Sequence, residues 1–425
     1  MTVTRFGIVG GGWWAEMYLR IAASLNQFEV SGMVVRREEA GKVLEQNWGV
    51  KTFRTVEAMA AALSGDDLLF IVIAVPQPAN AAMLKTVVSS GVPVLGQTPS
   101  GWTLEELIAL HSTITLAGGK VQIAEQYHLQ PIHQARLALI SSGKLGRISQ
   151  AQVSVATAYH GTSLARMYLG IGAEQCTVRA MFHDSPLVDG IGRYGSASGG
   201  QTVDKWQGGL RNAVHGPKDG SEVSVGDEVA NSSQTLAWLQ FDDGRLAVCD
   251  WSGDQYFSSI RSARVLVRGE KGEISNTTAR YLPGDDEPAV EFELRRVDIG
   301  PTEQWGNSLL GDFHRGYLGG SEWLFLNSFA PPRGHESLEA RLTDDELANA
   351  RTLEKMAAYV RGTGPEFYSV ADASQDRYLD LLIAEAAESG ETLVAVPQVW
   401  AGHVSTPQDR QWPTLPRSPA ANAKL

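Results

Sequence analysis

The sequence RFGIVGGGWWAEMYL, residues 5–19, carries the strongest structural signal in this chain. The apolar run at residues 6–9 indicates a strand, and a helical pattern follows directly after a glycine triplet. The spacing of Gly10, Gly12 and Ala15 fits G-x-G-x-x-A. The first glycine permits a tight turn, the second lets a phosphate approach the backbone, and the small last residue lets helix and strand pack closely. Because a helix N-terminus attracts anions, this stretch predicts a dinucleotide-binding turn.

Short apolar runs alternate with helical periodicities from this turn to residue 126. The run at residues 68–74 is continuously apolar, as expected for a parallel strand that is buried on both faces. Such alternation predicts a parallel sheet with right-handed crossovers, so residues 1–126 are expected to form a Rossmann domain. The expected strands are residues 6–9, 28–35, 68–74, 92–95 and 121–124, and the expected helices are 14–25, 38–47, 79–89 and 104–116.

Residues 127–400 predict a second α/β domain with an open, mostly antiparallel sheet, used for substrate binding and oligomerisation. A glycine-rich polar stretch at 182–227 is expected to be a long loop. The closing helix and strand fall within 374–396, and residues 401–425 have the composition of a disordered tail. The expected strands are 148–158, 233–241, 245–251, 262–267 and 290–297, and the expected helices are 344–361 and 374–388.

Composition narrows the class of protein. Hydrophobic residues make up 43% and charged residues 20% of the 425 residues, which is typical of a soluble globular protein with two domains. The net charge of −12 argues against a nucleic-acid-binding surface. We expect a cytoplasmic protein, because the sequence shows neither a signal peptide nor a membrane span. Reduced thiols are expected at Cys176 and Cys249, and the sequence predicts no metal site and no nucleophile elbow.

Two residue pairs are candidates for cofactor contacts besides the glycines. Trp13 and Trp14 either pack on the helix face or shield the cofactor side of the cleft. Arg36 and Arg37 end the second strand, where an NAD site usually has an acidic residue for the ribose hydroxyls. Arginine suits a 2′-phosphate, which favours NADP over NAD, although an arginine also stacks on adenine or is solvated.

Together these features resemble the glucose-fructose oxidoreductase / inositol dehydrogenase (Gfo/Idh/MocA) family over about residues 5–396. Residues 71–101 are similar to its fourth-strand and fifth-strand block, and residues 362–396 to its closing helix and strand. The resemblance implies a Rossmann domain followed by an α/β domain whose open sheet often serves as an oligomer interface. It also implies hydride transfer between NAD(P) and a secondary alcohol or ketone, commonly on a sugar or cyclitol.

One position departs from the family pattern. The family tends to have Glu-Lys-Pro at the end of the fifth strand, and this chain has Gln97, Thr98 and Pro99. A lysine with a lowered pKa takes the substrate's hydroxyl proton, whereas a threonine hydroxyl orients or relays and is not a base near neutral pH. The resemblance therefore implies cofactor contacts from Pro76, Gln97 and Gln126, a substrate contact from Thr98, and another acid–base group.

His160 is the first candidate for that group. The family signature often runs His, then Asp three residues on, then Arg; here the same spacing gives His160, Ser163 and Arg166. Residues three apart share a helix face, so the resemblance implies a substrate contact from Ser163. Replacing the carboxylate with Ser163 should remove one force that orients the imidazole and favours its charged form. The alternative is that His160 satisfies the start of a helix.

Tyr127 and His128 are expected to assist, because they follow a strand at the edge where ligands bind in open α/β sheets. Tyr127 acts as a base only with a lowered pKa and otherwise packs or hydrogen bonds. His128 is either a base or a substrate ligand, and Glu125 orients either residue. Less favoured candidates lie in the long loop: His183, Lys205, Trp206 and His215.

We therefore predict an NAD(P)-dependent oxidoreductase acting on a ring secondary alcohol or ketone of a sugar, glycoside or cyclitol. The expected partners are this small-molecule substrate and further copies of the chain, with no nucleic acid and no membrane. One alternative is a glycoside-cleaving enzyme that uses NAD transiently, by oxidation and elimination. The other is a non-catalytic cofactor-binding regulator, suggested by the missing lysine and aspartate.

Overall fold

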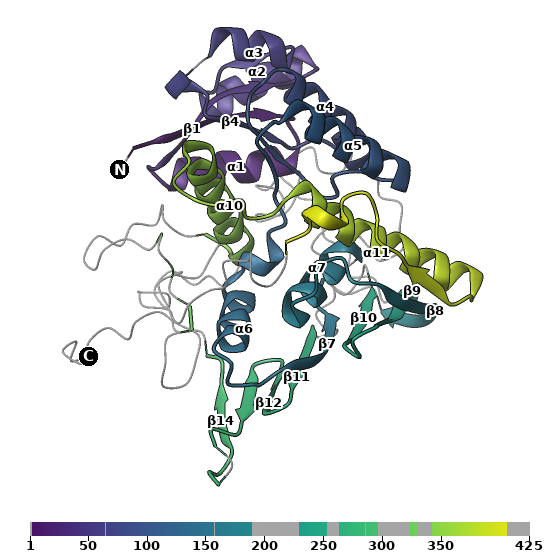
Figure 1. Cartoon of the computed structure of the whole chain (residues 1–425). Coiled ribbons are helices and arrows are strands. Elements are labelled where there is room, and N and C mark those ends of the chain that lie inside the picture. Colours follow the sequence, from purple (N-terminus) through teal and green to yellow (C-terminus); the bar gives the residue numbers. More distant parts are fainter. Residues whose placement is uncertain are drawn as a thin grey trace, which may run out of the picture.

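The computed structural model describes residues 2–63, 65–156, 158–188, 229–252, 263–284, 286–295, 324, 325, 327, 329 and 342–405. Two sheets organise these residues, one of six strands and one of nine. In Figure 1 the first sheet and its helices lie at the top, and the second sheet lies below them.

The first sheet is entirely parallel and has the strand order β3-β2-β1-β4-β5-β6. The order reverses between β1 and β4, which is the switch point where ligands bind in open α/β sheets. This is the predicted Rossmann domain, with two further elements, β3 and α3. The strands are β1 Thr4–Val9, β2 Phe28–Val34, β3 Thr52–Phe53, β4 Phe70–Ile73, β5 Val94–Gly96 and β6 Val121–Ile123. The helices are α1 Trp13–Ser24, α2 Glu38–Trp48, α3 Val56–Ala62, α4 Asn80–Ser89 and α5 Leu104–Ala117, with 3-10 turns at Gly65–Asp67, Gln77–Ala79 and Tyr127–Leu129.

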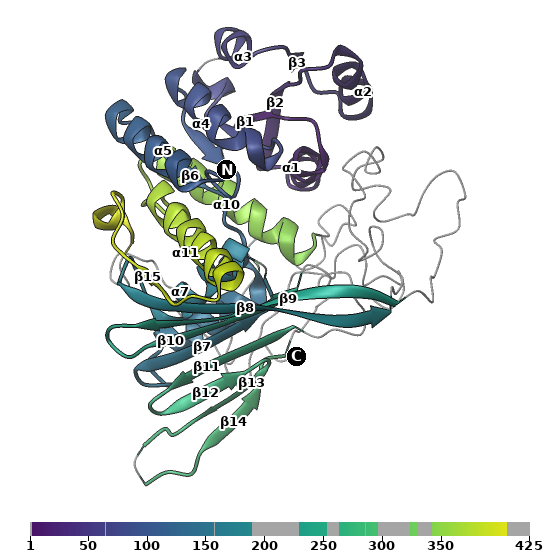
Figure 2. The same cartoon turned by 90° about the vertical axis from the view of Figure 1, so that its right-hand side faces the viewer.

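The second sheet is mostly antiparallel, with one parallel pair between β7 and β10, and has the order β14-β13-β12-β11-β7-β10-β9-β8-β15. Its strands are β7 Ile148–Ser154, β8 Cys176–Val188, β9 Val229–Phe241, β10 Leu246–Ser252, β11 Arg264–Gly269, β12 Gly272–Ser275, β13 Thr278–Tyr281, β14 Val290–Glu293 and β15 Leu393–Ala395. Its helices are α6 Pro131–Ser141, α7 Ala158–Leu169 and α11 Val370–Ser389. Figure 2 shows α7 and α11 on one side of this sheet.

The predicted loop at 182–227 is wrong in its first part. Residues 182–188 belong to β8, which pairs with β9 from Cys176↔Phe241 to Val188↔Val229. Residues 189–228 lie outside the described part of the chain. The strand predicted at 148–158 is also shorter, because β7 ends at Ser154 and α7 begins at Ala158.

Helix α10 Asp344–Arg361, predicted to belong to the second domain, packs on the Rossmann sheet beside α1. Its buried Leu347, Leu353 and Met356 share one hydrophobic cluster with residues of β1 and β4. A capping box between Thr343 and Glu346 fixes the start of the helix. The N-terminal domain therefore recruits a helix from far along the chain.

The first residues of the predicted tail are part of the fold. Ala401–His403 form a 3-10 turn, Trp400 is fully buried, and the Ser405 hydroxyl donates to Asp372 at 2.7 Å. Residues 406–425 lie outside the described residues.

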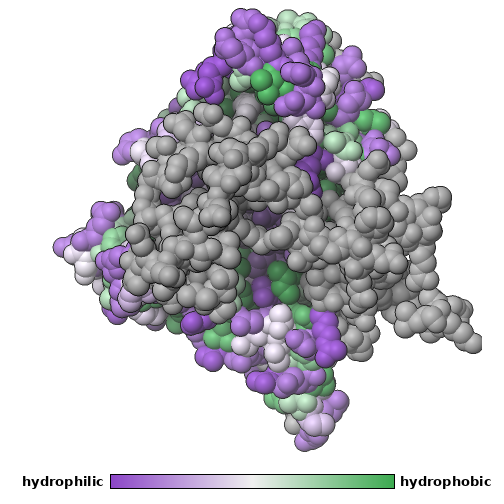
Figure 3. All heavy atoms as spheres, turned by 180° about the vertical axis from the view of Figure 1, so that it is seen from behind, coloured by the Kyte–Doolittle hydropathy of each residue, from purple (hydrophilic) through white to green (hydrophobic). Residues whose placement is uncertain are grey.

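The last features of the fold are the polarity of its surface and of its helices. Seen from behind, hydrophilic residues predominate on the outer surface of the Rossmann domain at the top, and hydrophilic and hydrophobic residues are mixed at the bottom (Figure 3). Among the described residues, no helix has the length and apolar character needed to cross a bilayer.

Candidate active site

The turn after β1 has the geometry that a dinucleotide requires. Gly10 has φ +125°, and a Cβ there would lie 2.0 Å from the carbonyl oxygen of Ala74, so only glycine fits. Gly12 caps α1, and the position of its missing Cβ has no atom within 4 Å. The first turn of α1 therefore has backbone N–H groups beside open space, where a pyrophosphate fits.

The two tryptophans of the turn pack together. Their rings stack with centroids 4.2 Å apart, and both half-buried side chains contact the hydrophobic cluster of the Rossmann domain. Ala15, which follows them, is fully buried, as its role in helix–strand packing requires. These contacts support the packing interpretation of Trp13 and Trp14. That the two rings shield a cofactor remains a prediction.

Arg36 and Arg37 are exposed and follow directly after β2, beyond the buried Val35. The Val35 carbonyl accepts a hydrogen bond from Arg54 Nη1 at 3.1 Å, which fixes the chain at this point. Two exposed guanidinium groups at this strand end fit the ribose-phosphate side of a dinucleotide.

Buried amide side chains follow the next strands. Gln97 comes after β5 and Gln126 after β6, and both are buried. Among the described residues, Oε1 of each has no hydrogen-bond partner, and the same is true of Oδ1 of Asn80. Asn80 Nδ2 donates to the carbonyls of Gln97 and Pro99 at 2.5 and 2.6 Å, which holds the loop after β5. Unpaired buried acceptors are costly, so these strand ends fit a ligand that supplies amide or hydroxyl donors. The predicted contact Pro76 lies exposed at the end of β4.

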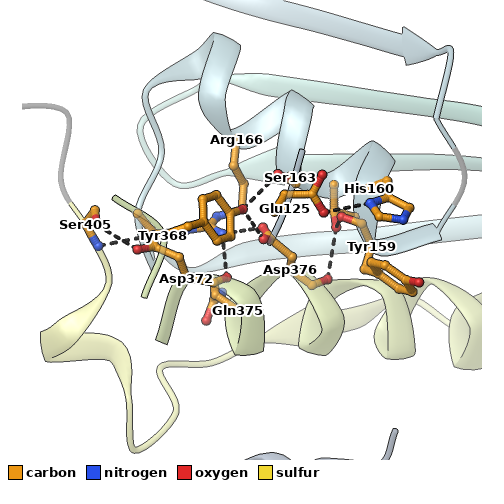
Figure 4. A network of polar contacts seen from close by, with 12 residues as sticks. Glu125, Tyr159, His160, Ser163, Arg166, Tyr368, Asp372, Gln375, Asp376 and Ser405 are labelled. Atoms are coloured by element: carbon orange, nitrogen blue, oxygen red, sulfur yellow. Dashed lines mark hydrogen bonds and ion pairs between the residues drawn. The ribbon is translucent and has the colours of Figure 1, made fainter. Parts of the chain in front are cut away.

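A carboxylate and an imidazole meet across the two domains. Glu125 follows β6, His160 lies in the first turn of α7, and Glu125 Oε2 is 2.7 Å from His160 Nδ1 (Figure 4). The Glu125 side chain is 1% exposed and that of His160 14%. The other carboxylate oxygen accepts from the Tyr127 backbone N–H at 3.2 Å. This arrangement assigns the proton to Nδ1 and leaves Nε2 as the hydrogen-bonding atom for a substrate.

Glu125 therefore supplies an orienting carboxylate to His160, in place of the aspartate of the family spacing. Ser163, which takes the aspartate's place in the family spacing, is fully buried, and its hydroxyl lies 2.8 Å from Tyr368 Oη. Arg166 is buried too and pairs with Asp376. Figure 4 shows Ser163 and Arg166 inside a network of polar contacts with α11, away from the Nε2 side of the His160 ring. This burial contradicts the predicted substrate contact of Ser163.

Tyr127 and His128, the two residues predicted to assist His160, lie in different surroundings. The ring of the half-buried Tyr127 is tilted against that of His160, with ring centroids 4.7 Å apart. His128 is buried, and its ring lies over Tyr368 with centroids 5.2 Å apart. Tyr127 thus neighbours the acid–base pair, whereas His128 faces the network of α11.

Tyr159 is a site residue that sequence reasoning missed. Its phenol oxygen accepts a hydrogen bond from Gln77 Nε2 at 2.9 Å, and the Thr98 side chain lies close enough to lower the pKa of the phenol. Its ring lies 4.4 Å from that of His160. Burial raises the pKa of Tyr159, and Glu125 adds to this, so the phenol stays protonated at neutral pH. No local motif marks Tyr159; only its position beside His160 in the sequence points to it.

Helix α11 supports the loop that carries Thr98. Arg377 donates to the Trp102 carbonyl at 3.0 and 3.2 Å, and its guanidinium lies 4.5 Å from the Trp102 ring. The same guanidinium pairs with the buried Asp380. Burial raises the pKa of Asp380, and the charge of Arg377 opposes this. The second domain therefore fixes the loop after β5 in place, and it also carries the residues that face this loop.

Other candidate residues lie elsewhere. His183 is exposed on β8, and Lys205, Trp206 and His215 lie outside the described residues. The described part of the chain contains no cluster of His, Cys, Asp and Glu that fits a metal ion. Cys176 and Cys249 are free and buried, and burial raises the pKa of both thiols.

Comparison with known proteins gives the family of the N-terminal domain. Residues 4–125 match the oxidoreductase family with an NAD-binding Rossmann fold. D-apiose dehydrogenase of Paraburkholderia graminis is 25% identical over 160 residues, 37% of this chain and 42% of that protein. Rhizopine catabolism protein MocA of Rhizobium meliloti is 30% identical over 132 residues, 31% of this chain and 37% of that protein. The chain thus aligns with about two fifths of the length of these relatives.

Solved structures match nearly the whole chain. An oxidoreductase from Agrobacterium radiobacter in complex with NAD+, L-tartaric acid and magnesium has a TM-score of 0.61 at 14% identity, covering 92% of this chain and 98% of its own. Levoglucosan dehydrogenase in complex with NADH has a TM-score of 0.61 at 15% identity, with 94% and 100% covered. A putative myo-inositol dehydrogenase from Sinorhizobium meliloti has a TM-score of 0.58 at 15% identity, with 93% and 100% covered. Residues 4–125 therefore match the Gfo/Idh/MocA oxidoreductase family model with its NAD-binding Rossmann fold, and the chain as a whole shares the fold of these solved structures.

Proposed function

We propose that this protein is a cytoplasmic NAD(P)-dependent oxidoreductase that acts on a ring secondary alcohol or ketone of a sugar, glycoside or cyclitol. The observation that carries the proposal is the Glu125–His160 pair, 2.7 Å apart at the end of β6. This pair lies at the carboxyl edge of the same sheet whose β1 leads into the glycine turn. A group that accepts a proton thus lies at the edge where a dinucleotide binds in this fold.

His160 is the proton acceptor in this proposal. A bound nicotinamide dinucleotide supplies the hydride acceptor for oxidation, or the hydride donor for reduction. Nε2 of His160 takes the proton of the substrate hydroxyl during oxidation and returns it during reduction. Glu125 accepts the hydrogen bond from Nδ1–H, holds the ring in one orientation and stabilises the imidazolium that forms. Thr98 then has no need to act as a base.

The cofactor residues follow from the same geometry. Gly10 and Gly12 receive the pyrophosphate at the start of α1. The buried amides of Gln97 and Gln126 hold the nicotinamide half, because their unpaired oxygens accept hydrogen bonds. Arg36 and Arg37 bind the adenosine ribose, and their charge favours NADP.

The substrate class rests on the character of the site and on the relatives. Near His160 the described side chains are hydroxyl, amide, imidazole and carboxylate groups, which suit a polyol. D-apiose dehydrogenase, levoglucosan dehydrogenase and a putative myo-inositol dehydrogenase act, by their names, on such compounds.

The open face of the second sheet is the proposed interface between copies of the chain. Arg179 and Met181 on β8 pair with Trp238 and Leu236 on β9, so all four point to one face. Met181 is 48% exposed and Trp238 43%. Large apolar side chains exposed in one patch mark an interaction surface. Light scattering tests this, and Trp238→Glu should shift the protein towards the monomer.

A turnover assay tests the proposed activity. Purified protein is mixed with NAD or NADP and a panel of sugars, cyclitols and glycosides, and the absorbance of the reduced nicotinamide is followed. The proposal expects reduction with at least one neutral polyol. Aglycone release without net cofactor reduction would instead indicate cleavage by transient oxidation. Cofactor binding without any turnover or cleavage would indicate a non-catalytic regulator and overturn the proposal.

A further inference from the structure

The residue in the family's lysine position faces a phenol. Thr98 follows β5 of the Rossmann domain, and its side chain lies close enough to the phenol of Tyr159, in the first turn of α7 of the second domain, to lower the pKa of that phenol. Gln77, after β4, donates to the same phenol oxygen at 2.9 Å. Three elements of both domains therefore converge on one hydroxyl group.

The phenol of Tyr159 lies beside His160, the proposed proton acceptor. Tyr159 and His160 are neighbours in the sequence, and their ring centroids are 4.4 Å apart. Tyr159 is 8% exposed and Thr98 7%, whereas Gln77 is exposed at the end of β4. The phenol oxygen thus lies at the strand ends, on the same edge as Glu125 and Gln97.

The hydrogen bonds around the phenol leave its own proton for a ligand. A tyrosine hydroxyl has one proton to donate and accepts on its oxygen. Gln77 Nε2 donates to that oxygen, and the Thr98 hydroxyl is able to donate to it as well. Burial, Glu125 and Asp380 all raise the pKa of Tyr159, so the proton stays on the oxygen across the neutral pH range.

We propose that Tyr159 takes over the substrate-facing role of the missing lysine by donating a hydrogen bond to the reacting oxygen of the polyol. This inference rests on the proposed function. The phenol stays protonated throughout; it stabilises the negative charge that develops on the oxygen, while His160 moves the proton. Thr98 and Gln77 position the phenol, and the lysine's charged donor is replaced by a neutral one.

Tyr159→Phe keeps the ring that packs on His160 and removes the donor. We expect kcat/KM to fall by about 10²–10³-fold, mainly through kcat, as for the loss of one donor to a developing oxyanion. Thr98→Val removes only a positioning hydroxyl and should cost less, roughly threefold to tenfold, since a neutral hydrogen bond contributes about 1 kcal/mol. The control is Tyr281→Phe, which makes the same change on β13, where the hydroxyl contacts only Lys144 at 3.4 Å among the hydrogen bonds described.

Further readouts separate this role from a structural one. The melting temperature and the dissociation constant for the cofactor should be unchanged in Tyr159→Phe, and the pH profile of kcat should keep its shape because His160 remains. Retained kcat/KM in Tyr159→Phe, with wild-type turnover intact, would overturn this inference alone. A kcat/KM loss that comes with a matching loss of folding or cofactor binding would overturn it as well. A cofactor-loaded wild type that neither turns over nor binds any polyol would overturn the proposed function and this role together.

Discussion

The Glu125 carboxylate lies 2.7 Å from Nδ1 of His160, although the two residues belong to different domains. Glu125 follows β6 of the Rossmann sheet, and His160 lies in the first turn of α7, on the second sheet. The pair is complete only when both domains are in place. Their packing therefore sets the geometry of the proposed proton transfer.

Substitutions at this pair should affect turnover unequally. His160→Gln removes the proton acceptor, and we expect kcat to fall by about 10²–10⁴-fold. Glu125→Gln keeps an oxygen that accepts from Nδ1–H but loses the charge, so we expect a smaller loss, on the order of 10–100-fold. Steady-state kinetics measures both effects, and cofactor titration serves as the control. Unchanged turnover in His160→Gln would rule out its role as the proton acceptor.

The two glycines of the turn should respond differently to alanine. In Gly10→Ala the new Cβ meets the Ala74 carbonyl and the backbone keeps φ +125°, so we expect destabilisation on the order of 1–3 kcal/mol or more. In Gly12→Ala the Cβ meets nothing in the free protein, so stability should change by no more than about 1 kcal/mol. The cofactor should nevertheless bind more weakly to Gly12→Ala, because the methyl group enters the pyrophosphate space. Denaturant unfolding and cofactor titration separate the two effects. Equal stability of the two variants would contradict this account of the turn.

Arg36 should select between the two nicotinamide cofactors. Arg36→Asp removes a charged donor from the end of β2, so the NADP dissociation constant should rise by roughly tenfold to a hundredfold, since hydrogen bonds to charged groups contribute about 1.5–3 kcal/mol. NAD binding should be kept or improved, because an acidic side chain there accepts from the ribose hydroxyls. Arg268→Asp on β11 makes the same charge change far from the turn and should alter neither constant. Equal weakening of both cofactors by Arg36→Asp would show that Arg36 does not read the 2′-phosphate.

The buried carboxyl of Asp376 predicts how stability changes with pH. Burial raises the pKa of Asp376 to about 6, against the opposing charge of Arg166 and the hydrogen bond from Tyr368. The folded state thus holds this proton more tightly than the unfolded state. The contribution to stability is complete below the unfolded pKa of 3.8 and is lost as the pH rises through about 6.

Asp376→Asn should flatten this dependence. The free energy of unfolding of the wild type, relative to Asp376→Asn, should fall between pH 4 and 6 with a slope of up to about 1.4 kcal/mol per pH unit. Urea unfolding at several pH values measures the difference. The control Asp67→Asn changes an exposed side chain 3.8 Å from Arg5 and should leave the slope as it is. A relative stability that rises with pH in this window would show that the ion pair with Arg166 outweighs burial.

The Rossmann domain could be predicted because its signals are local. The glycine spacing and the continuous apolar run of β4 are properties of a few neighbouring residues. Strand β8 was not predicted, because pairing with β9 along its length holds it rather than a pattern of its own. The packing of α10 on α1 depends on contacts such as Tyr18 Oη to Asn349 Oδ1 at 3.1 Å, which join residues far apart in the sequence.

The same difference between local signals and long-range contacts explains which site residues could be predicted from the sequence. The sequence places His160 at the start of a helix and Glu125 at a strand end, but nothing local relates two residues 35 positions apart. The family spacing pointed to Ser163 as the companion of His160, whereas the fold supplies Glu125. Tyr159 was missed because its partners, Gln77 and Thr98, lie across the domain boundary.

The most direct test of the central claim is a crystal structure with NAD(P) and an unreactive polyol analogue. It measures the distance from His160 Nε2 to the oxygen on the carbon that faces the nicotinamide. Our account predicts hydrogen-bond contact, about 2.6–3.2 Å, with Nδ1 still held by Glu125. An analogue oxygen bound to another group, with His160 Nε2 out of hydrogen-bonding range, would contradict it.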